Sequence, residues 1–459
     1  MPEYDEDMQR RREKREAMKR KQKARARRLR LTLILALLIL AGAAFGIYTL
    51  VQKNDASHAL QATEPEETEE ETQEETSDIL DPITVVHVRA AGDLNVTDSV
   101  IASGQSATGY DYTAAFRDVA AVLSEADLTV MNFEGNIYGT PYGTATSSAP
   151  VEILTALRNA GVDMLQIANS CTINNGLNGL NSTIQAIRNA GIEPLGAYAT
   201  ESEFKQYKGY TITEVRGVKI AFVAFTKGMS GRGMPVGSEN LVNLLYEDYA
   251  DEYQTVDEKR ITQILKNAAA ERPDLTVALV HWGSEYNDDL SRSQQRIVSL
   301  MKKQGVDVIL GTHPHLVQRI DFDPAAGTLV AYSLGDFFGD AERGGTSYSI
   351  ILDIEITKDA AAGTTKVTGF DYTPIYTVKP SEAEGDYRIS RVMRIDKTLE
   401  AYNGNFLDRV TKTCSENMKF AQTRIEARLK MAMTEEERDE EAKKAKEAKE
   451  ASKAAETNG

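Results

Sequence analysis

The sequence predicts an α/β fold, because a unit of helix followed by strand recurs along the chain. In each copy an apolar helical stretch ends at a glycine, and a short apolar strand follows. The three copies span residues 154–168, 184–195 and 297–310. A further helix and strand, at 114–131, follow the same order without the glycine. Strands that alternate with helices in this way are buried in a sheet that helices cover.

The later part of the chain adds strands without intervening helices. Apolar stretches at 217–224, 328–334 and 348–356 are each predicted to be a strand. We therefore expect a mixed sheet, or two sheets packed together. The main domain is expected at 82–356. The segment 357–433 either completes it or forms a small appendage, because about 350 residues suffice for one large domain or for one domain with an appendage.

The amino-terminal part of the chain has the pattern of a membrane anchor. Residues 1–30 are rich in Arg and Lys, and the run 31–51 contains no charged residue. An apolar run of about 20 residues matches the hydrocarbon core of a bilayer. A cleaved signal peptide is the alternative, since 41–44 supplies small residues, but its apolar core would be only about 7–15 residues long. The basic flank places the amino terminus in the cytoplasm, so we expect one transmembrane helix in the cell membrane and an extracytoplasmic main domain.

Two charged segments flank the main domain. Residues 52–81 are rich in Glu and Thr and carry almost no large apolar side chains, so we expect an extended, disordered linker. Residues 434–459 consist largely of Glu, Lys and Ala without an apolar stripe, which indicates a solvated helix or a disordered tail.

The composition argues against three classes of protein. The formal net charge of −16 argues against nucleic acid as a partner. Only Cys171 and Cys414 are present, which argues against a disulfide-rich scaffold. A single disulfide is possible, but the fold must depend on its apolar core. No glycine-rich Walker loop occurs, which argues against ATP-driven polymerisation by this chain.

Three of the five histidines stand where strands are predicted to end. His313 and His315 follow one apolar run, and His281 follows another. In an extended segment residues i and i+2 point to the same side, and Pro314 favours this shape, so the two imidazoles can converge on a metal ion or an anionic group. Each histidine alone could be a hydrogen-bonded structural residue, but three at strand ends are hard to explain by packing.

Carboxylates and amides are predicted to meet these histidines. In open α/β sheets, ligands bind beyond the carboxyl ends of the strands. The other residues at predicted strand ends are Asp93, Asn132, Glu134, Asn169, Ser170 and Cys171. Carboxylates and imidazoles with a single thiol are typical of a hydrolytic Zn²⁺, Mn²⁺ or Fe site rather than a structural zinc site. The alternative for Asp93 and Glu134 is an ordinary turn or helix cap.

Six short motifs follow one another in the main domain. They are Gly92-Asp93, Asn132-Phe133-Glu134, Ala168-Asn169-Ser170-Cys171 through Gly176, His281–Tyr286, Gly311–His315 and Tyr332–Phe337. In this order they resemble the CapA family of poly-γ-glutamate and capsule synthesis proteins, which in turn resembles the calcineurin-like metallophosphoesterases. The resemblance covers about residues 85–340. It implies a four-layer α/β/β/α sandwich, a membrane-anchored extracytoplasmic domain, and a role in making or exporting an anionic surface polymer.

The resemblance also implies a role for each strand-end residue. It implies one or two divalent ions, Mn, Zn or Fe, held by Asp93, Glu134, His281, His313 and His315. Asn132 and Asn169 would bind the substrate. Cys171 and His315 would take the catalytic positions, with His315 either on the metal or stabilising an oxyanion.

Three residues depart from the phosphoesterase pattern. Asn95 stands where the first motif has a histidine, Ser170 stands in place of a metal-binding asparagine, and Cys171 stands in place of the histidine that protonates the leaving group. A serine hydroxyl is a poor neutral ligand, and a thiol protonates a leaving oxygen only if its pKa suits. The resemblance therefore implies a partly degenerate site.

The sequence thus predicts a membrane-anchored, extracytoplasmic, CapA-like protein. Its expected role is in the synthesis, export or attachment of an anionic capsule polymer such as poly-γ-glutamate. The expected partners are the membrane, the polymer and the membrane proteins of polymer synthesis. The alternative is an active metal-dependent hydrolase of a phosphate ester or of a γ-glutamyl polymer.

Overall fold

The computed structural model describes most of the main domain. The described residues are 83–385, 389–404 and 409–430. The predicted basic tail, transmembrane helix, acidic linker and carboxyl-terminal charged tail all lie outside these ranges. Within the described ranges, no helix combines the length and the hydropathy needed to cross a membrane.

The larger of two mixed sheets has the strand order β16-β15-β14-β1-β4-β5-β6, and β13 pairs with the end of β1. Its strands are β1 (Ile83–Asn95), β4 (Leu128–Glu134), β5 (Met164–Gln166), β6 (Glu193–Leu195), β13 (Asp336–Phe338), β14 (Tyr348–Asp359), β15 (Thr364–Val378) and β16 (Arg391–Arg394). β1, β4, β5 and β6 run parallel, whereas β14, β15 and β16 pair antiparallel. The chain after β14 thus extends the sheet that β1 begins.

The smaller sheet has the order β11-β12-β10-β9-β8-β7. Its strands are β7 (Tyr210–Val215), β8 (Val218–Thr226), β9 (Leu275–His281), β10 (Val308–Thr312), β11 (Ile320–Asp323) and β12 (Thr328–Ala331), and a separate hairpin pairs β2 (Gln105–Ser106) with β3 (Gly109–Tyr110). The central strands β8, β9, β10 and β12 are parallel, and the edge strands are antiparallel. The predicted α/β fold with mixed sheets is confirmed.

The central strands are apolar on both faces because each sheet lies between two cores. In β9, Val277 and Leu279 pack between the sheets, whereas Ala278 and Val280 pack against the helices of the smaller sheet. Successive side chains of a strand point to opposite faces. An unbroken apolar run is therefore the pattern of a strand that is covered on both sides.

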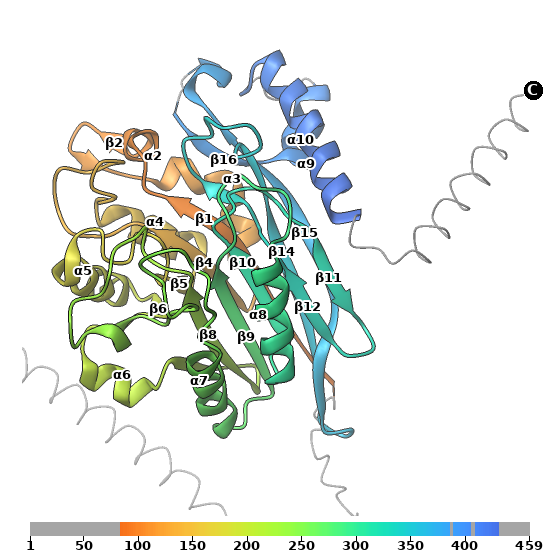
Figure 1. Cartoon of the computed structure of the whole chain (residues 1–459). Helices are drawn as coiled ribbons and strands as arrows, with labels where there is room; N and C mark the ends of the chain where they lie inside the picture. The colour runs from red at the N-terminus through yellow and green to blue at the C-terminus, as the bar shows by residue number, and fades with distance from the viewer. Residues whose placement is uncertain (1–82, 386–388, 405–408, 431–459) are drawn as a thin grey trace, which may run out of the picture. The chain divides into compact units, whose positions relative to one another are not determined.

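Helices cover the outer face of each sheet, so that helices, sheet, sheet and helices lie in layers (Figure 1). Outside the larger sheet lie α2 (Asp98–Ser103), α3 (Thr113–Ser124), α4 (Glu152–Ala160), α5 (Gly176–Asn189) and α6 (Glu201–Tyr207), and outside the smaller sheet lie α7 (Glu258–Ala270) and α8 (Arg292–Lys303). α9 (Ile395–Asn403) instead packs on β15 and β16, α10 (Lys412–Lys430) packs on β14 and β15, and both continue the core between the sheets. Short 3₁₀ turns occur at Glu239–Leu241 and Pro380–Glu382.

One strand is shorter than predicted. The stretch 328–334 was expected to be a single strand, but β12 ends at Ala331. The chain then turns at Gly335, where φ is +79°, and enters the larger sheet as β13. In this register Asp336 pairs with Asp93 of β1. The switch between sheets therefore places two acidic residues side by side.

Gly92 precedes Asp93 where β1 meets the turn before β13. A Cβ atom at position 92 would lie 1.8 Å from the carbonyl oxygen of Gly335, a backbone atom. We expect Gly92→Ala to lower the free energy of unfolding by about 1–3 kcal/mol through overpacking, as measured by urea denaturation. Gly344→Ala is the matched control, because its Cβ would meet nothing within 4 Å, and it should change stability by less than about 0.5 kcal/mol. Equal effects of the two changes would contradict this account.

Candidate metal centre

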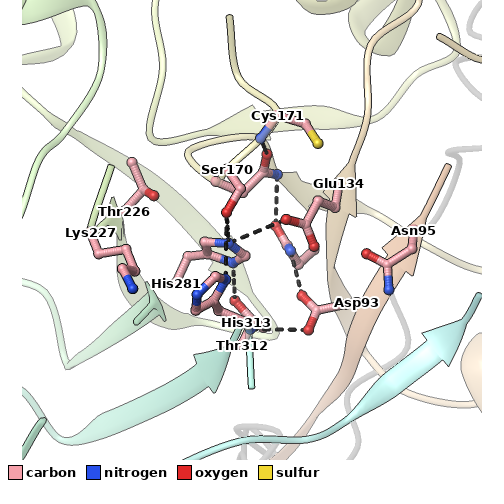
Figure 2. A network of polar contacts seen from close by, with 12 residues as sticks. Asp93, Asn95, Glu134, Ser170, Cys171, Thr226, Lys227, His281, Thr312 and His313 are labelled. Atoms are coloured by element: carbon pink, nitrogen blue, oxygen red, sulfur yellow. Dashed lines mark hydrogen bonds and ion pairs between the residues drawn. The ribbon is translucent and has the colours of Figure 1, made fainter. Parts of the chain in front are cut away.

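Residues from both sheets meet at the carboxyl ends of the parallel strands. Asp93 lies near the end of β1, and Glu134 is the last residue of β4. His281 is the last residue of β9, and His313 and His315 follow β10. These five residues are at most 7% exposed. The structure thus brings together every residue predicted to bind metal, with carboxylates from one sheet and imidazoles from the other. Figure 2 shows four of them, Asp93, Glu134, His281 and His313.

Among the residues that the structure describes, three sets of donors in or beside this cluster could hold a divalent ion. In each set the ligand atoms lie within 4.8 Å of one another. The sets are Glu134, His281 and His313; Asp93, His315 and Asp336; and Glu285, His313 and His315. Carboxylate oxygens and imidazole nitrogens together suit Zn²⁺, Mn²⁺ or Fe, so the donor chemistry agrees with the predicted cofactor.

The Glu134 carboxylate is the part of the cluster that best fits a cation. Its Oε1 lies 3.4 Å from Nε2 of His281, but its buried Oε2 has no hydrogen-bond partner among the described residues. Burial, together with the charge of Glu134, raises the pKa of the nearby Asp93. A buried carboxylate oxygen without a partner is costly. A divalent ion would satisfy this oxygen, so the residues present fit a metal.

The turn that carries His313 and His315 differs from the extended segment predicted for it. Backbone φ is +94° at His313 and +59° at His315, in the left-handed region that few residues other than glycine adopt. The predicted extended shape is wrong, yet the two rings do converge, with centroids 6.0 Å apart. The His313 N–H donates to Oδ2 of Asp93 at 3.0 Å, and this bond between the sheets holds the turn. Such conformations cost about 1–3 kcal/mol each and are concentrated at functional sites.

The three imidazoles differ in their surroundings. Burial and the neighbouring His281 lower the pKa of His313 well below its ordinary range, so its ring is neutral and can donate a lone pair. Burial would also lower the pKa of His315, but Asp336, 2.8 Å from its Nδ1, raises it to about 10. Nδ1 of His281 lies 3.1 Å from the Thr312 hydroxyl, which orients that ring.

Asn132 and Asn169 lie beneath the cluster and hold Asp93 in place. Nδ2 of Asn132 donates to Oδ1 of Asp93 at 2.6 Å, and Nδ2 of Asn169 donates to Oδ1 of Asn132 at 3.0 Å. Asn169 also donates to the carbonyl of Phe133 and accepts the N–H of Cys171. Both asparagines are at most 1% exposed. These contacts indicate a positioning role, and the contact with substrate stays a prediction.

Ser170 lies between two imidazoles, whereas the Cys171 thiol points away from them (Figure 2). Oγ of Ser170 is 3.0 Å from Nε2 of His281 and 3.5 Å from Nδ1 of His313. Burial raises the pKa of the Cys171 thiol, so the thiol keeps its proton. Cys171 and Cys414 are both free, so the disulfide considered from the sequence is not formed.

A cavity of about 320 Å³ gives access to the cluster. Its lining includes Asn95, Glu134, Ser170, Cys171, His315 and Asp336. Asn95, which stands in place of a histidine, donates to Oδ1 of Asp336 at 2.8 Å. Candidate donors and both predicted catalytic residues are therefore within reach of a ligand that enters this cavity.

Three residues of the centre were missed in the sequence: Asp336, Glu285 and Lys227. Asp336 follows Gly335 as Asp93 follows Gly92, so the same glycine-aspartate signal could have found it. Glu285 follows His281 within the same motif. Lys227 comes directly after β8, and reading that strand to its end would have identified it. The strand-end argument thus applies to Lys227, whereas Asp336 and Glu285 needed the motifs that contain them.

Comparison with known proteins identifies the family. Residues 87–341 match the family described as "Bacterial capsule synthesis protein PGA_cap", and this match covers more than half of the chain. The chain belongs to this family. The predicted CapA family is thereby confirmed, and every residue of the centre described above lies within the matched span.

Two relatives of this capsule synthesis family protein are themselves named CapA. The chain is 28% identical over 261 residues to "Capsule biosynthesis protein CapA" of Bacillus anthracis, over 55% of this chain and 60% of the relative. It is 26% identical over 276 residues to "PGA biosynthesis protein CapA" of Bacillus subtilis (strain 168), over 59% of this chain and 67% of the relative. The chain thus spans about 60% to 67% of the length of these relatives.

Solved structures similar to this chain include two proteins of low sequence identity. A phosphatase from Mycoplasma pneumoniae is 14% identical with a TM-score of 0.40, over 64% of this chain and 94% of that chain. A putative 5′-nucleotidase from Staphylococcus aureus is 13% identical with a TM-score of 0.43, over 63% of this chain and 54% of that chain.

His313 belongs to two of the donor sets, so its loss should remove metal from this capsule synthesis protein. We expect the native chain to bind about one divalent ion and His313→Ala to bind none. The one donor set without His313 is Asp93, His315 and Asp336, and its Asp93 oxygens and His315 Nδ1 are already hydrogen-bonded. Equilibrium dialysis followed by elemental analysis measures this. His87→Ala is the matched control, since His87 pairs with Asp353 away from the cluster. An unchanged metal content in His313→Ala would show that the cluster does not bind metal.

Proposed function

We propose that this protein is a membrane-anchored, extracytoplasmic component of capsule biosynthesis that takes part in the synthesis, export or attachment of an anionic polymer such as poly-γ-glutamate. Its family supports the proposal, as do relatives named for capsule and PGA biosynthesis. The basic segment 1–30 and the apolar run 31–51 support the anchor and its orientation. The partners in this proposal are the membrane, the polymer and the membrane proteins that make it.

The pair Ser170 and Cys171 is the observation that favours binding over catalysis. Hydrolysis at a metal centre of this type needs an activated water and an acid that protonates the leaving oxygen. The Cys171 thiol is held protonated by burial and points away from the imidazoles (Figure 2). A positioned general acid contributes about 10²–10⁴-fold to a rate. We therefore infer a domain that binds the polymer and hydrolyses it slowly at most.

A stack of three side chains favours an anionic ligand at the cavity. The Tyr286 ring stacks on His315 with centroids 5.2 Å apart, and the Arg343 guanidinium lies 4.1 Å from the centroid of Tyr286 on the lining of the same cavity. Stacking holds a guanidinium by its face and leaves the N–H groups along its edge for a carboxylate or phosphate. Tyr286, which stacks on the candidate metal ligand His315, thus holds Arg343 at the cavity.

The same cavity also carries acidic side chains, so anion binding there requires additional positive charge. Glu285 and Asp340 contribute to its lining, so Arg343 alone does not balance the local negative charge. A bound divalent ion would supply additional positive charge beside Glu134. An anionic polymer is therefore expected to bind only when the centre is loaded with metal.

Polymer binding tests this proposal directly. Poly-γ-glutamate should bind the native full-length chain when Mn²⁺ is present and should lose that binding when EDTA removes the ion. Arg343→Gln should weaken binding about tenfold by removing a charge-assisted contact, as measured by isothermal titration calorimetry. Arg272→Gln is the matched control, because Arg272 precedes β9 and so lies at its opposite end from His281. Binding that EDTA and Arg343→Gln both leave unchanged would refute a role for this cavity.

An active hydrolase of a phosphate ester or γ-glutamyl polymer is the second candidate. The remaining donors favour it, since Asp93, Glu134 and the three histidines are all buried and each belongs to at least one donor set. Such an enzyme would need Cys171 or His315 to protonate the leaving group.

The two candidates differ in their response to Ser170→Asn combined with Cys171→His. Hydrolysis of a simple phosphodiester by the native chain should be close to background. The double change introduces an amide ligand and an imidazole acid, so the rate should rise by about 10²-fold or more. Ser170→Ala with Cys171→Ala is the control that removes both side chains without adding either function. Rapid metal-dependent turnover by the native chain, abolished in Cys171→Ser, would instead establish the hydrolase and identify the thiol as its acid.

A further inference from the structure

Lys227 follows the end of β8, the strand next to β9, which ends at His281. In the smaller sheet Thr226, His281 and Thr312 are aligned across β8, β9 and β10. Lys227 is the next residue after Thr226, and its N–H donates to the carbonyl of His281 at 2.8 Å. The backbone therefore fixes Lys227 next to His281, as it fixes His313 after Thr312.

The ammonium group of Lys227 is directed to the centre and anchored there. Nζ donates to the carbonyl of Gly283 at 2.7 Å and lies 4.4 Å from the centroid of the Tyr253 ring. Lys227 is half-buried and shares the lining of a cavity of about 310 Å³ with His313 and Glu285. Figure 2 shows Lys227 on the opposite side of the imidazoles from Asp93 and Asn95.

Lys227 shares its cavity with two members of one donor set. Glu285 and His313 belong to the set that also includes His315. His315, the remaining member of the set, is already engaged with Asp336 at 2.8 Å. A second cation at this set would share the cavity with the ammonium, and two like charges there repel each other.

We propose that Lys227 supplies the positive charge that a second divalent ion would otherwise bring to Glu285, His313 and His315. In the set of Asp93, His315 and Asp336, both oxygens of Asp93 already accept hydrogen bonds, and Nδ1 of His315 is paired with Asp336. The set of Glu134, His281 and His313 then binds a single divalent ion per chain. This inference rests on the metal centre of the proposed function and specifies its stoichiometry. The ammonium also remains available, beside the ion, to an anionic ligand in the cavity.

Counting bound ions tests the proposal. The full-length chain, stripped with EDTA and titrated with Mn²⁺, should bind one ion per chain. Lys227→Met removes the charge at similar side-chain length and should bind two. Lys227→Arg keeps the charge and should bind one. Electron paramagnetic resonance gives a second measurement, because two neighbouring Mn²⁺ ions in Lys227→Met should couple, whereas the native chain should show the signal of isolated Mn²⁺.

A double variant identifies where the additional ion binds. Lys227→Met with Glu285→Gln should return the stoichiometry to one, and it also shows that the change at position 227 leaves a folded centre. Two ions in the native chain, or one ion in Lys227→Met, would overturn the role of Lys227 while leaving the metal centre itself intact. A native chain that binds no Mn²⁺ would instead overturn the metal centre and this inference together.

Discussion

The apolar core between the two sheets is the interaction on which the rest of this structure depends. Phe222 and Val277 of the smaller sheet and Val88 and Val130 of the larger sheet belong to it. Fully burying side chains of this kind contributes about 1.5–3 kcal/mol each. Close packing also leaves the sheets little freedom to slide past each other. Since carboxylates come from one sheet and imidazoles from the other, this core decides whether a metal centre forms at all.

Asp93 shows how polar contacts complete that alignment. Its N–H donates to the carbonyl of Gly335, its Oδ1 accepts from Asn132 within the larger sheet, and its Oδ2 accepts the N–H of His313 from the smaller sheet. One buried carboxylate is thereby tied to both sheets. The left-handed backbone of His313 and the burial of the Asp93 carboxylate, which raises its pKa, both cost free energy. The apolar core must offset this cost. Costs of this kind are expected where a site binds a ligand.

Charge balance connects the centre to the proposed role in capsule synthesis. The chain is acidic overall, with a formal net charge of −16, and the cavity contains acidic side chains of its own. Within the two cavities beside the cluster, positive charge comes from Lys227, from His315 paired with Asp336, and from Arg343 stacked on Tyr286. In the proposed function a divalent ion adds to this charge. An anionic polymer would then be attracted to the loaded centre, whereas the net negative charge of the chain opposes nonspecific adsorption.

The sequence by itself determined the class of fold, the family and most of the donors, because these depend on local patterns. The apolar run of β9 could be recognised with His281 at its end, and Gly161 after α4 adopts the left-handed conformation expected of a helix end. Only the tertiary structure decided which sheet each strand joins, since an apolar run fits either sheet equally well. It therefore placed Asp336 beside Asp93, bent the turn at His313, directed the Cys171 thiol away from the imidazoles, and brought Lys227 to Glu285. These features follow from contacts between segments far apart in the chain, which local sequence patterns do not specify.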